Sequence, residues 1–495
     1  MKKTLLATLL ACSLQNSRAG DDFACEAPAT WFPHTTTPAP DFHNPDANSE
    51  GECGFYRWAW QTFLYLTQPV EGGQPRFLTF KTPAELFVSK SKTPAETLDL
   101  AKKGQLSSLE RFTTPIRSME ISRGHTLRLA PRLEKQKGAN IGGNSILQAD
   151  ALGALVDQNG HAVYYGMHVN ERFVQFCVDE KFTDASNLAI VGDDKPFPTG
   201  SIELKSSWKI VEKGESEDGF YVTDATLPSL VAGEGGAVTV DASKPISARV
   251  ALVGLHVVGV VEGHPEFVWA TFEHRKNAPY LNGAPMGDDG PKAANGDFVV
   301  SPFDKTFYKA QSKAKECNVP NAKTNIPANR LRFDGDPAGQ KLLPHTQVFR
   351  QFQFGGEQDP AEIRDLNDSV HAQLNQSSVW KSYGLVGALW LEHPGTDFKS
   401  GQDFDATAEQ LVDAGHPPFS KEFEDGMDAF FGGEYRLSNS TMETFTQPQK
   451  HCFSCHSTEK EKNAPAGFLP FPARKVGVSH ILREAYKDNP RPVGP

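Results

Sequence analysis

The sequence predicts an α+β protein in which a β-rich N-terminal body is followed by a mostly α-helical C-terminal region. Between about residues 75 and 300, short β-branched and aromatic runs are separated by turn signals. After about residue 358, apolar residues recur at helical spacing. The chain also contains 42 Gly and 35 Pro among its 495 residues, which favours many loops and argues against an all-helical protein.

The first residues have the pattern of an export signal. Lys2 and Lys3 precede a short apolar run, and small residues flank Arg18 at the expected cleavage site, so we interpret 1–19 as a signal peptide. The run is far shorter than the roughly 20 residues of a membrane span. Cleavage would deliver the protein to the periplasm. The alternative is a lipoprotein anchored at Cys12, which follows Leu-Leu-Ala.

The rest of the chain divides into three parts by composition. Residues 20–52 are rich in Pro, Thr, Asn and Asp and predict an extended lead-in. The β-rich body covers 53–350, and 351–495 form the helical region. Within the body we expect a helix at 55–66 and strands at 77–80, 202–210, 249–261 and 267–272. We also expect a hairpin that turns at Asn159–Gly160 and a loop-like stretch at 277–345.

Three segments carry the prediction for the helical region. Residues 360–374 place four aliphatic side chains at helical spacing, and 420–431 are amphipathic. Residues 383–391 are strongly apolar, and we assign them to a helix that ends near His393.

Four cysteines form an even set outside the N-terminal signal and the C-terminal motif described next. An oxidising compartment would permit two disulfides among Cys25, Cys53, Cys177 and Cys317, with Cys25 and Cys53 as the nearer pair. The alternative for Cys177, which lies in an apolar run, is a buried free thiol.

The residues that carry chemistry are Cys452-Phe453-Ser454-Cys455-His456. Two thiols three positions apart can add to the two vinyl groups of one haem, and the adjacent His456 can then be the proximal iron ligand. A zinc site would need a second ligand pair, and no Cys follows Cys455. A thioredoxin-like pair would follow a strand, which 447–451 do not resemble.

With this motif, the chain resembles the c-type cytochromes, which attach haem through Cys-x-x-Cys-His. The resemblance implies one covalently attached haem c, with Cys452 and Cys455 as attachment residues and His456 as the proximal ligand. It covers the motif and its surroundings and leaves the β-rich body out. Residues 437–445 and 58–64 are also similar to bacterial proteins grouped in the cytochrome c family without an assigned activity.

The sixth iron ligand is open from the sequence. Many c-type cytochromes use a downstream Met, but no Met follows Met442 here. His480 is the only His after the motif and is our first candidate, and Met442 is the second. A ligand from elsewhere, or water, completes the alternatives.

A second group of candidate residues lies in the β-rich body: His256, His264, Glu266, Glu273 and His274. Strand alternation puts Glu266 and His274 on one face. Together they could bind a metal or line a pocket against the haem, whereas the alternative interpretation is a set of hydrogen-bonded core residues. For Trp208 and Trp269 we expect core positions.

Three functions are compatible with these features. The leading hypothesis is electron transfer with a periplasmic redox partner protein, and the others are a haem enzyme of peroxidase or oxygenase type with a small-molecule substrate and a haem-based sensor. The size of the body favours a role beyond that of a simple carrier. The net charge of −11 gives no support for nucleic-acid binding.

Overall fold

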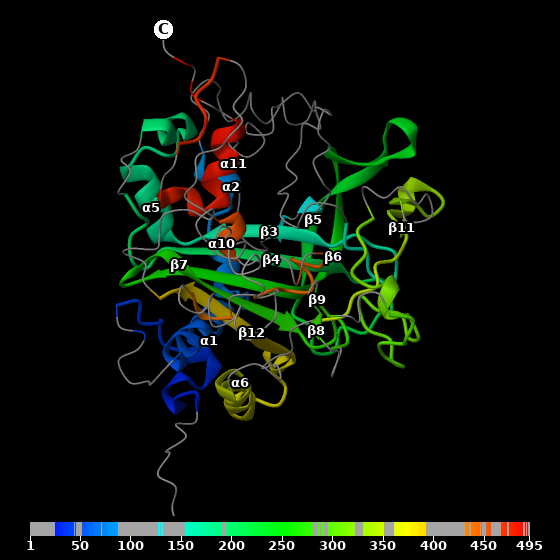
Figure 1. Ribbon diagram of the computed structural model, residues 1–495, viewed down its shortest axis with the longest axis horizontal. Coiled ribbons are helices and arrows are strands. Elements are labelled where there is room, and N and C mark those ends of the chain that lie inside the picture. The colour runs from blue at the N-terminus through cyan, green and yellow to red at the C-terminus, as the bar shows by residue number, and fades with distance from the viewer. Residues whose placement is uncertain are drawn as a thin grey trace, which may run out of the picture.

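The computed structural model describes residues 25–43, 45, 52–70, 72–87, 127–128, 130–131, 154–190, 195–280, 286–287, 290–291, 296–321, 330–350, 361–392, 431–434, 437–445, 447, 452–456, 467–472, 475–488, 491 and 493. Its central feature is a nine-stranded sheet with the main order β13-β12-β7-β6-β4-β3-β2, and with β5 and β1 branching from β6 (Figure 1). The strands are β1 Leu127–Arg128, β2 Ala130–Pro131, β3 Tyr164–Val169, β4 Ile202–Ile210, β5 Val222–Ala232, β6 Val238–Val261, β7 His264–His274, β12 Tyr383–Leu391 and β13 Phe431–Gly433.

Strand β6 organises the sheet because it is long enough to serve three neighbours. One edge of β6 pairs with β4, and the other edge pairs first with β5 and then with β7. Val250 and Ala251 of β6 pair with β4 and β5 at the same time, so β4 and β5 must lie on opposite edges. Every pairing in the sheet is antiparallel except that of β1 with β5.

Helices cover both faces of the sheet (Figure 1). On one face, α1 (Cys53–Thr67) and α6 (Ala361–Gln373) pack in a single apolar cluster with β4, β6, β7 and β12. On the other face, α5 (Glu171–Asp179), α10 (Cys452–Cys455) and α11 (His480–Asp488) share a second cluster with β3, β6 and β7. We call this second side the motif face, because it carries Cys452 and His456.

The structure confirms most of the predicted elements of the body and one helix of the C-terminal region. The strands expected at 202–210, 249–261 and 267–272 are β4, the second half of β6 and part of β7, and the helices expected at 55–66 and 360–374 are α1 and α6. The turn at Asn159–Gly160 closes a short hairpin with a bridge between Val156 and Ala162.

Two assignments are wrong. Residues 77–80 fall mostly in a 3-10 helix, Arg76–Thr79, which follows Pro75. Residues 383–391 are strand β12, paired between β7 and β13, and not part of a helix. Every residue of β12 is buried, so both of its faces are apolar and the continuous apolar run carries no period that distinguishes a strand from a helix.

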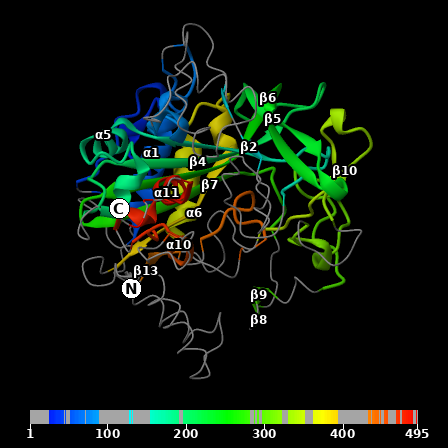
Figure 2. The ribbon, with the colours of Figure 1, turned by 90° about the horizontal axis from the view of Figure 1, so that it is seen from above.

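The described residues between 277 and 345 form only short elements, in agreement with the loop-like prediction for this stretch. It contains the two-residue strands β8 Met286–Gly287, β9 Gly290–Pro291, β10 Arg332–Phe333 and β11 Leu342–Leu343, and the 3-10 turns Ala314–Glu316 and Pro337–Gly339. Figure 2 shows β10 beside the outer half of β5 and β6, away from α10 and α11.

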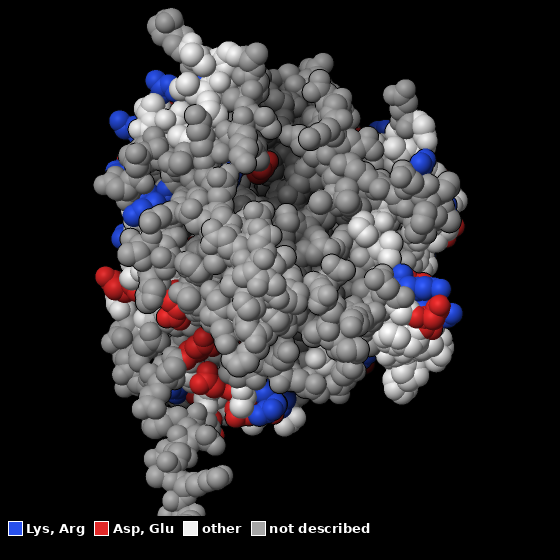
Figure 3. All heavy atoms as spheres, in the orientation of Figure 1, with Lys and Arg blue, Asp and Glu red and all other residues white. Residues whose placement is uncertain are grey.

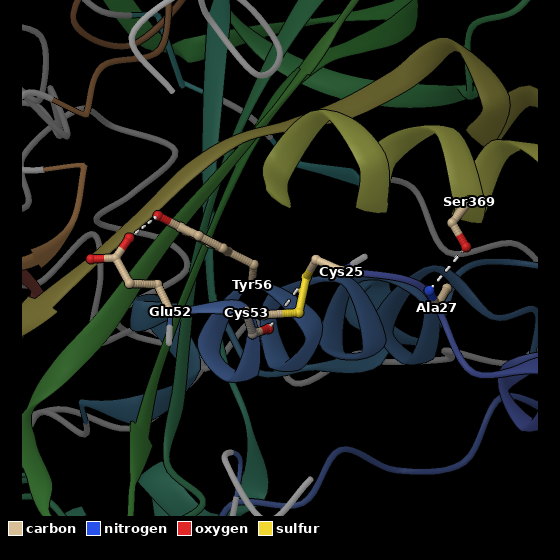
Figure 4. Close-up of a disulfide and its surroundings, with 6 residues drawn as sticks. All are labelled: Cys25, Ala27, Glu52, Cys53, Tyr56 and Ser369. Atoms are coloured by element: carbon tan, nitrogen blue, oxygen red, sulfur yellow. Dashed lines mark hydrogen bonds between the residues drawn. A yellow bond between two sulfur atoms is a disulfide. The ribbon is translucent and has the colours of Figure 1, made fainter. Parts of the chain in front are cut away.

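One disulfide ties the lead-in to the first long helix. Cys25 bonds to Cys53 at the start of α1, and the Ala27 amide donates to Ser369 Oγ of α6 at 3.0 Å (Figure 4). The lead-in then forms two 3-10 turns, Ala29–Trp31 and His34–Thr36. The second expected disulfide is wrong, because Cys177 and Cys317 are buried thiols in different apolar clusters.

Several predictions lie outside the described residues. These are the signal peptide 1–19, Cys12, His393 and the helix expected at 420–431, of which only Phe431, in β13, is described. Among the helices that the structure describes, none is long and apolar enough to cross a membrane.

Candidate functional site

The motif forms one turn of helix followed by His456. Helix α10 runs from Cys452 to Cys455, and the His456 amide donates to the Cys452 carbonyl at 2.9 Å. Positions i, i+3 and i+4 of a helix share a face, so the backbone places positions 452, 455 and 456 on one side of this turn. For Cys455 the structure describes the backbone only. The Phe453 side chain is buried and anchors the turn in the apolar cluster of the motif face.

Three contacts orient the His456 ring. Its Nδ1 donates to the Val478 carbonyl at 2.7 Å, and its ring lies 4.1 Å from that of Trp269 and 3.8 Å from that of His480, measured between centroids. Because Nδ1 is engaged, the lone pair on Nε2 is the one available to a metal. Burial, reinforced by His480, Lys205 and His256, lowers the pKa of His456 well below its usual range, which keeps the imidazole in the neutral form that binds metals.

A buried carboxyl holds the loop that orients His456. Ser479, directly after Val478, donates from its Oγ to Glu203 Oε2 of β4 at 2.7 Å. Glu203 and Ser479 are both buried. Burial raises the pKa of Glu203 to about 7, against the opposing effects of the Ser479 hydrogen bond and of Lys205. The sheet therefore positions His456 through Glu203, Ser479 and Val478 in turn.

The register of the sheet lays out three rows of side chains beneath the motif. Directly paired residues of antiparallel strands point to the same face, and residues two apart on a strand continue that face. The first row is Val169, Glu203, Val258 and Trp269; the second is Met167, Lys205, His256 and Thr271; the third is Tyr165, Ser207, Gly254 and Glu273.

Residues 437–445 cover the third row and satisfy its polar groups. Thr441 Oγ1 lies 2.6 Å from Ser207 Oγ, and Ser440 Oγ donates to Glu273 Oε2 at 2.6 Å. Glu273 also pairs with Arg350, whose Nε lies 2.9 Å from the same oxygen. These buried hydrogen bonds hold 437–445 on the third row, a short distance before the motif in the sequence.

His256, in the second row, is hydrogen-bonded to an acid of this covering segment. Its Nε2 donates to Glu443 Oε1 at 3.1 Å, and both side chains are partly exposed. In the orientation of Figure 1, Lys and Arg side chains of the described residues gather at the upper left of the molecule, and Asp and Glu side chains gather at its lower left (Figure 3).

The structure brings one of the two candidate sixth ligands to His456. His480 begins α11 and stacks on the His456 ring at an interplanar angle of 16°. His480 could serve as a second ligand only after its ring leaves the face of the His456 ring, because two imidazoles stacked face to face cannot both direct a ring nitrogen at one metal ion. Met442 is fully buried in another cluster, with Tyr165 and Phe307, and is not brought to His456.

The second group of candidates does not form one site. His264 binds Glu266 at 2.9 Å and its ring contacts Phe55 of α1, on the face opposite the motif. His274, at the far end of β7, donates to the Gly219 carbonyl. Of this group, His256 alone is among the residues that perturb the pKa of His456.

Trp269 is the residue that sequence reasoning assigned incompletely. It is 7% exposed and belongs to the core as expected, but its ring also contacts that of His456. A strand pattern shows which face a residue occupies and not what covers that face, so this contact had no signal in the sequence. Phe471 joins the same cluster as Phe453, whereas Phe468 is 37% exposed.

The described residues fit a covalently attached haem. One helical face carries the motif, the histidine is neutral with Nε2 available, and the surrounding side chains of Trp269 and Phe453 are apolar. In the part of the chain that the structure describes, no group of three or more His, Cys, Asp or Glu is arranged to hold a metal ion. No family model, curated protein or solved structure matches the chain.

Proposed function

We propose that the protein is an exported c-type cytochrome that carries one haem at Cys452, Cys455 and His456 and transfers electrons to or from a periplasmic partner protein. The observation that carries this proposal is the hydrogen bond from His456 Nδ1 to the Val478 carbonyl, which leaves Nε2 for an iron next to the two thiol positions. When bound, the haem supplies the one-electron couple. The chain's own residues orient the ligand, and the apolar cluster around Phe453 limits access of water.

A haem-dependent oxidoreductase acting on a small molecule is the second candidate. The hydrogen-bonded pair of His256 and Glu443, on the motif face near His456, favours it because such a pair can donate or accept a proton. The same geometry would also serve a haem-based sensor that binds a small gas.

Covalent haem staining of a denaturing gel tests the attachment. The wild-type protein, produced with its export signal in a host that matures c-type cytochromes, should stain, and the double variant Cys452→Ala, Cys455→Ala should not. Replacement of Cys317 by Ala, a buried thiol in another cluster, is the matched control and should retain the stain. Staining that persists in the double variant would refute the proposal.

Carbon monoxide separates electron transfer from the second candidate. If both axial positions are filled by protein ligands, the ferrous spectrum should be low-spin and unchanged by the gas. His480→Ala should then make the iron reactive toward carbon monoxide if His480 is the sixth ligand. Rapid binding by the wild-type protein would exclude a six-coordinate carrier and favour an enzyme or a sensor.

A further inference from the structure

The strongest observation outside the motif is a chain of contacts around one edge of the sheet. Strand β13 ends the described part of the sheet, and its partner there is β12. An edge strand turns alternate amides away from its neighbour, and each of them needs another acceptor. The Gly433 amide of β13 donates to Glu52 Oε1 at 2.7 Å. A carboxylate at the start of α1 therefore holds the edge of the sheet.

The composition of β13 makes this hydrogen bond important. Two of its three residues, Gly432 and Gly433, are glycines, whose backbones lose the most conformational freedom on folding. Gly433 also has a φ of 77°. Phe431 is the one large side chain of the strand, so we expect the bond to Glu52 to contribute much of the order of β13.

Glu52 is itself fixed by its neighbours on α1 (Figure 4). The next residue, Cys53, forms the disulfide with Cys25. Tyr56, one turn further along α1, donates from its hydroxyl to Glu52 Oε2 at 2.8 Å. Burial, reinforced by Glu52 and Glu434, raises the pKa of Tyr56 well above its usual range, so the hydroxyl keeps its proton and remains a donor. The disulfide thus fixes the backbone beside Glu52, and Tyr56 fixes its carboxylate.

On the motif face, β13 contacts the motif itself. The Phe431 ring stacks on that of Phe453 of α10, with centroids 5.8 Å apart and an interplanar angle of 17°. The Phe453 ring meets Trp269 edge to face, and Trp269 contacts the His456 ring. Movement of β13 would therefore displace a ring against which the motif turn is packed.

We propose that Glu52 is a positioning residue that couples the disulfide-bonded start of α1 to the Cys-x-x-Cys-His turn. It acts through β13, because its bond to Gly433 keeps Phe431 stacked on Phe453 and this stack holds the turn on the sheet. The inference deepens the proposed function and rests on it for the purpose of the turn, which is the proposed site of haem attachment. The contacts that carry the inference belong to the chain alone.

Hydrogen exchange of the purified full-length protein, followed by mass spectrometry of its peptides, tests the coupling. Two amides report it: that of His456, which donates to the Cys452 carbonyl, and that of Glu434, which donates to the Ala388 carbonyl of β12. In Glu52→Ala both peptides should exchange about 10-fold faster or more, since the variant loses a hydrogen bond to a charged acceptor. Glu52→Gln should show a smaller increase, because its amide oxygen can still accept from the β13 amide. Peptides from β4 should exchange as in the wild type, which separates positioning from a general loss of stability.

Asp336→Ala is the matched control. The Asp336 carboxylate also accepts a backbone amide at the start of a helical turn, that of Ala338 at 2.9 Å, but this turn lies beside β5. The control should leave exchange at His456 unchanged. The double variant Glu52→Ala, Phe431→Ala tests the route: if Glu52 acts through Phe431, the double variant should exchange no faster at His456 than Phe431→Ala alone.

The inference is overturned if Glu52→Ala leaves exchange at His456 unchanged, if β4 exchanges faster by the same factor, or if the effects of the two substitutions add. If Glu52→Ala does not fold, Glu52→Gln decides, and exchange at His456 equal to that of the Asp336 control would overturn the inference. Absence of covalent haem from the wild-type protein would instead overturn the proposed function. The gel stain and the exchange rates therefore report the two failures separately.

Discussion

Replacement of Glu203 by Gln should remove a pH-dependent loss of stability. The Glu203 carboxyl is buried under the motif and accepts a hydrogen bond from Ser479. Burial raises its pKa from 4.5 to about 7. A glutamine keeps an oxygen that can accept from Ser479 Oγ but has no proton to lose, so this variant isolates the titration from the contact.

The magnitude follows from the pKa shift. The folded state binds this proton more tightly than the unfolded state, so the associated stability is present below about pH 4.5 and is lost as the pH rises to about 7. One pKa unit corresponds to 1.36 kcal/mol, so the shift is worth about 3 kcal/mol. Between pH 5 and pH 8 the wild-type protein should lose most of this free energy of unfolding, whereas Glu203→Gln should not.

Chemical denaturation at pH 5, 6, 7 and 8, followed by far-ultraviolet circular dichroism, measures the effect. The control is Glu217→Gln, because Glu217 is exposed and the adjacent Arg249 lowers its pKa, so it stays ionised across this range. The reasoning is refuted if the difference in unfolding free energy between wild type and Glu203→Gln is the same at all four pH values.

Two further predictions concern stability. Replacing Cys25 by Ser removes the disulfide to Cys53, whose sequence separation is 28. Without reductant, the free energy of unfolding of this variant should be about 3–4 kcal/mol lower than that of the wild type, and with reductant the two proteins should have the same value. Gly254→Ala would place a Cβ 2.5 Å from Thr441 Oγ1, and this overpacking should lower the free energy of unfolding by about 1–3 kcal/mol, which is seen as a lower melting temperature. The control is Gly339→Ala, which should be nearly neutral because the added Cβ would have no atom within 4 Å.

The sequence was sufficient to predict elements whose signal is local. Strand β4 and helix α6 carry their own periodicity or length, and the Cys-x-x-Cys-His spacing carries its chemistry within five residues. Strand β12 was misassigned because burial on both faces removes the period, and only its pairing with β7 distinguishes it from a helix. The predicted disulfide between Cys177 and Cys317 is wrong, because an even number of cysteines does not show which thiols lie close enough in the fold to form a bond.

The surroundings of His456 could not be predicted for a different reason. Its neighbours come from β4, β7 and the segment before α11, which are far apart in the sequence and meet only through the sheet register. His480 was singled out as the only downstream histidine, and the structure does place it beside His456. The stacked orientation of the two rings, however, depends on how Val478 is held and not on the spacing.

This arrangement gives a physical reason for the large sheet in a protein with one motif. Covalent attachment tethers a haem but does not orient its histidine, since a tether of single bonds leaves the ring free to rotate. Here the orientation depends on Val478, the loop position depends on Glu203, and the entry of the chain depends on Ser207 and Glu273. Because Glu203, Ser207 and Glu273 belong to one sheet, a shift of β4 by one residue would turn Glu203 and Ser207 to the opposite face together. The register of the sheet is therefore a condition for the geometry around His456.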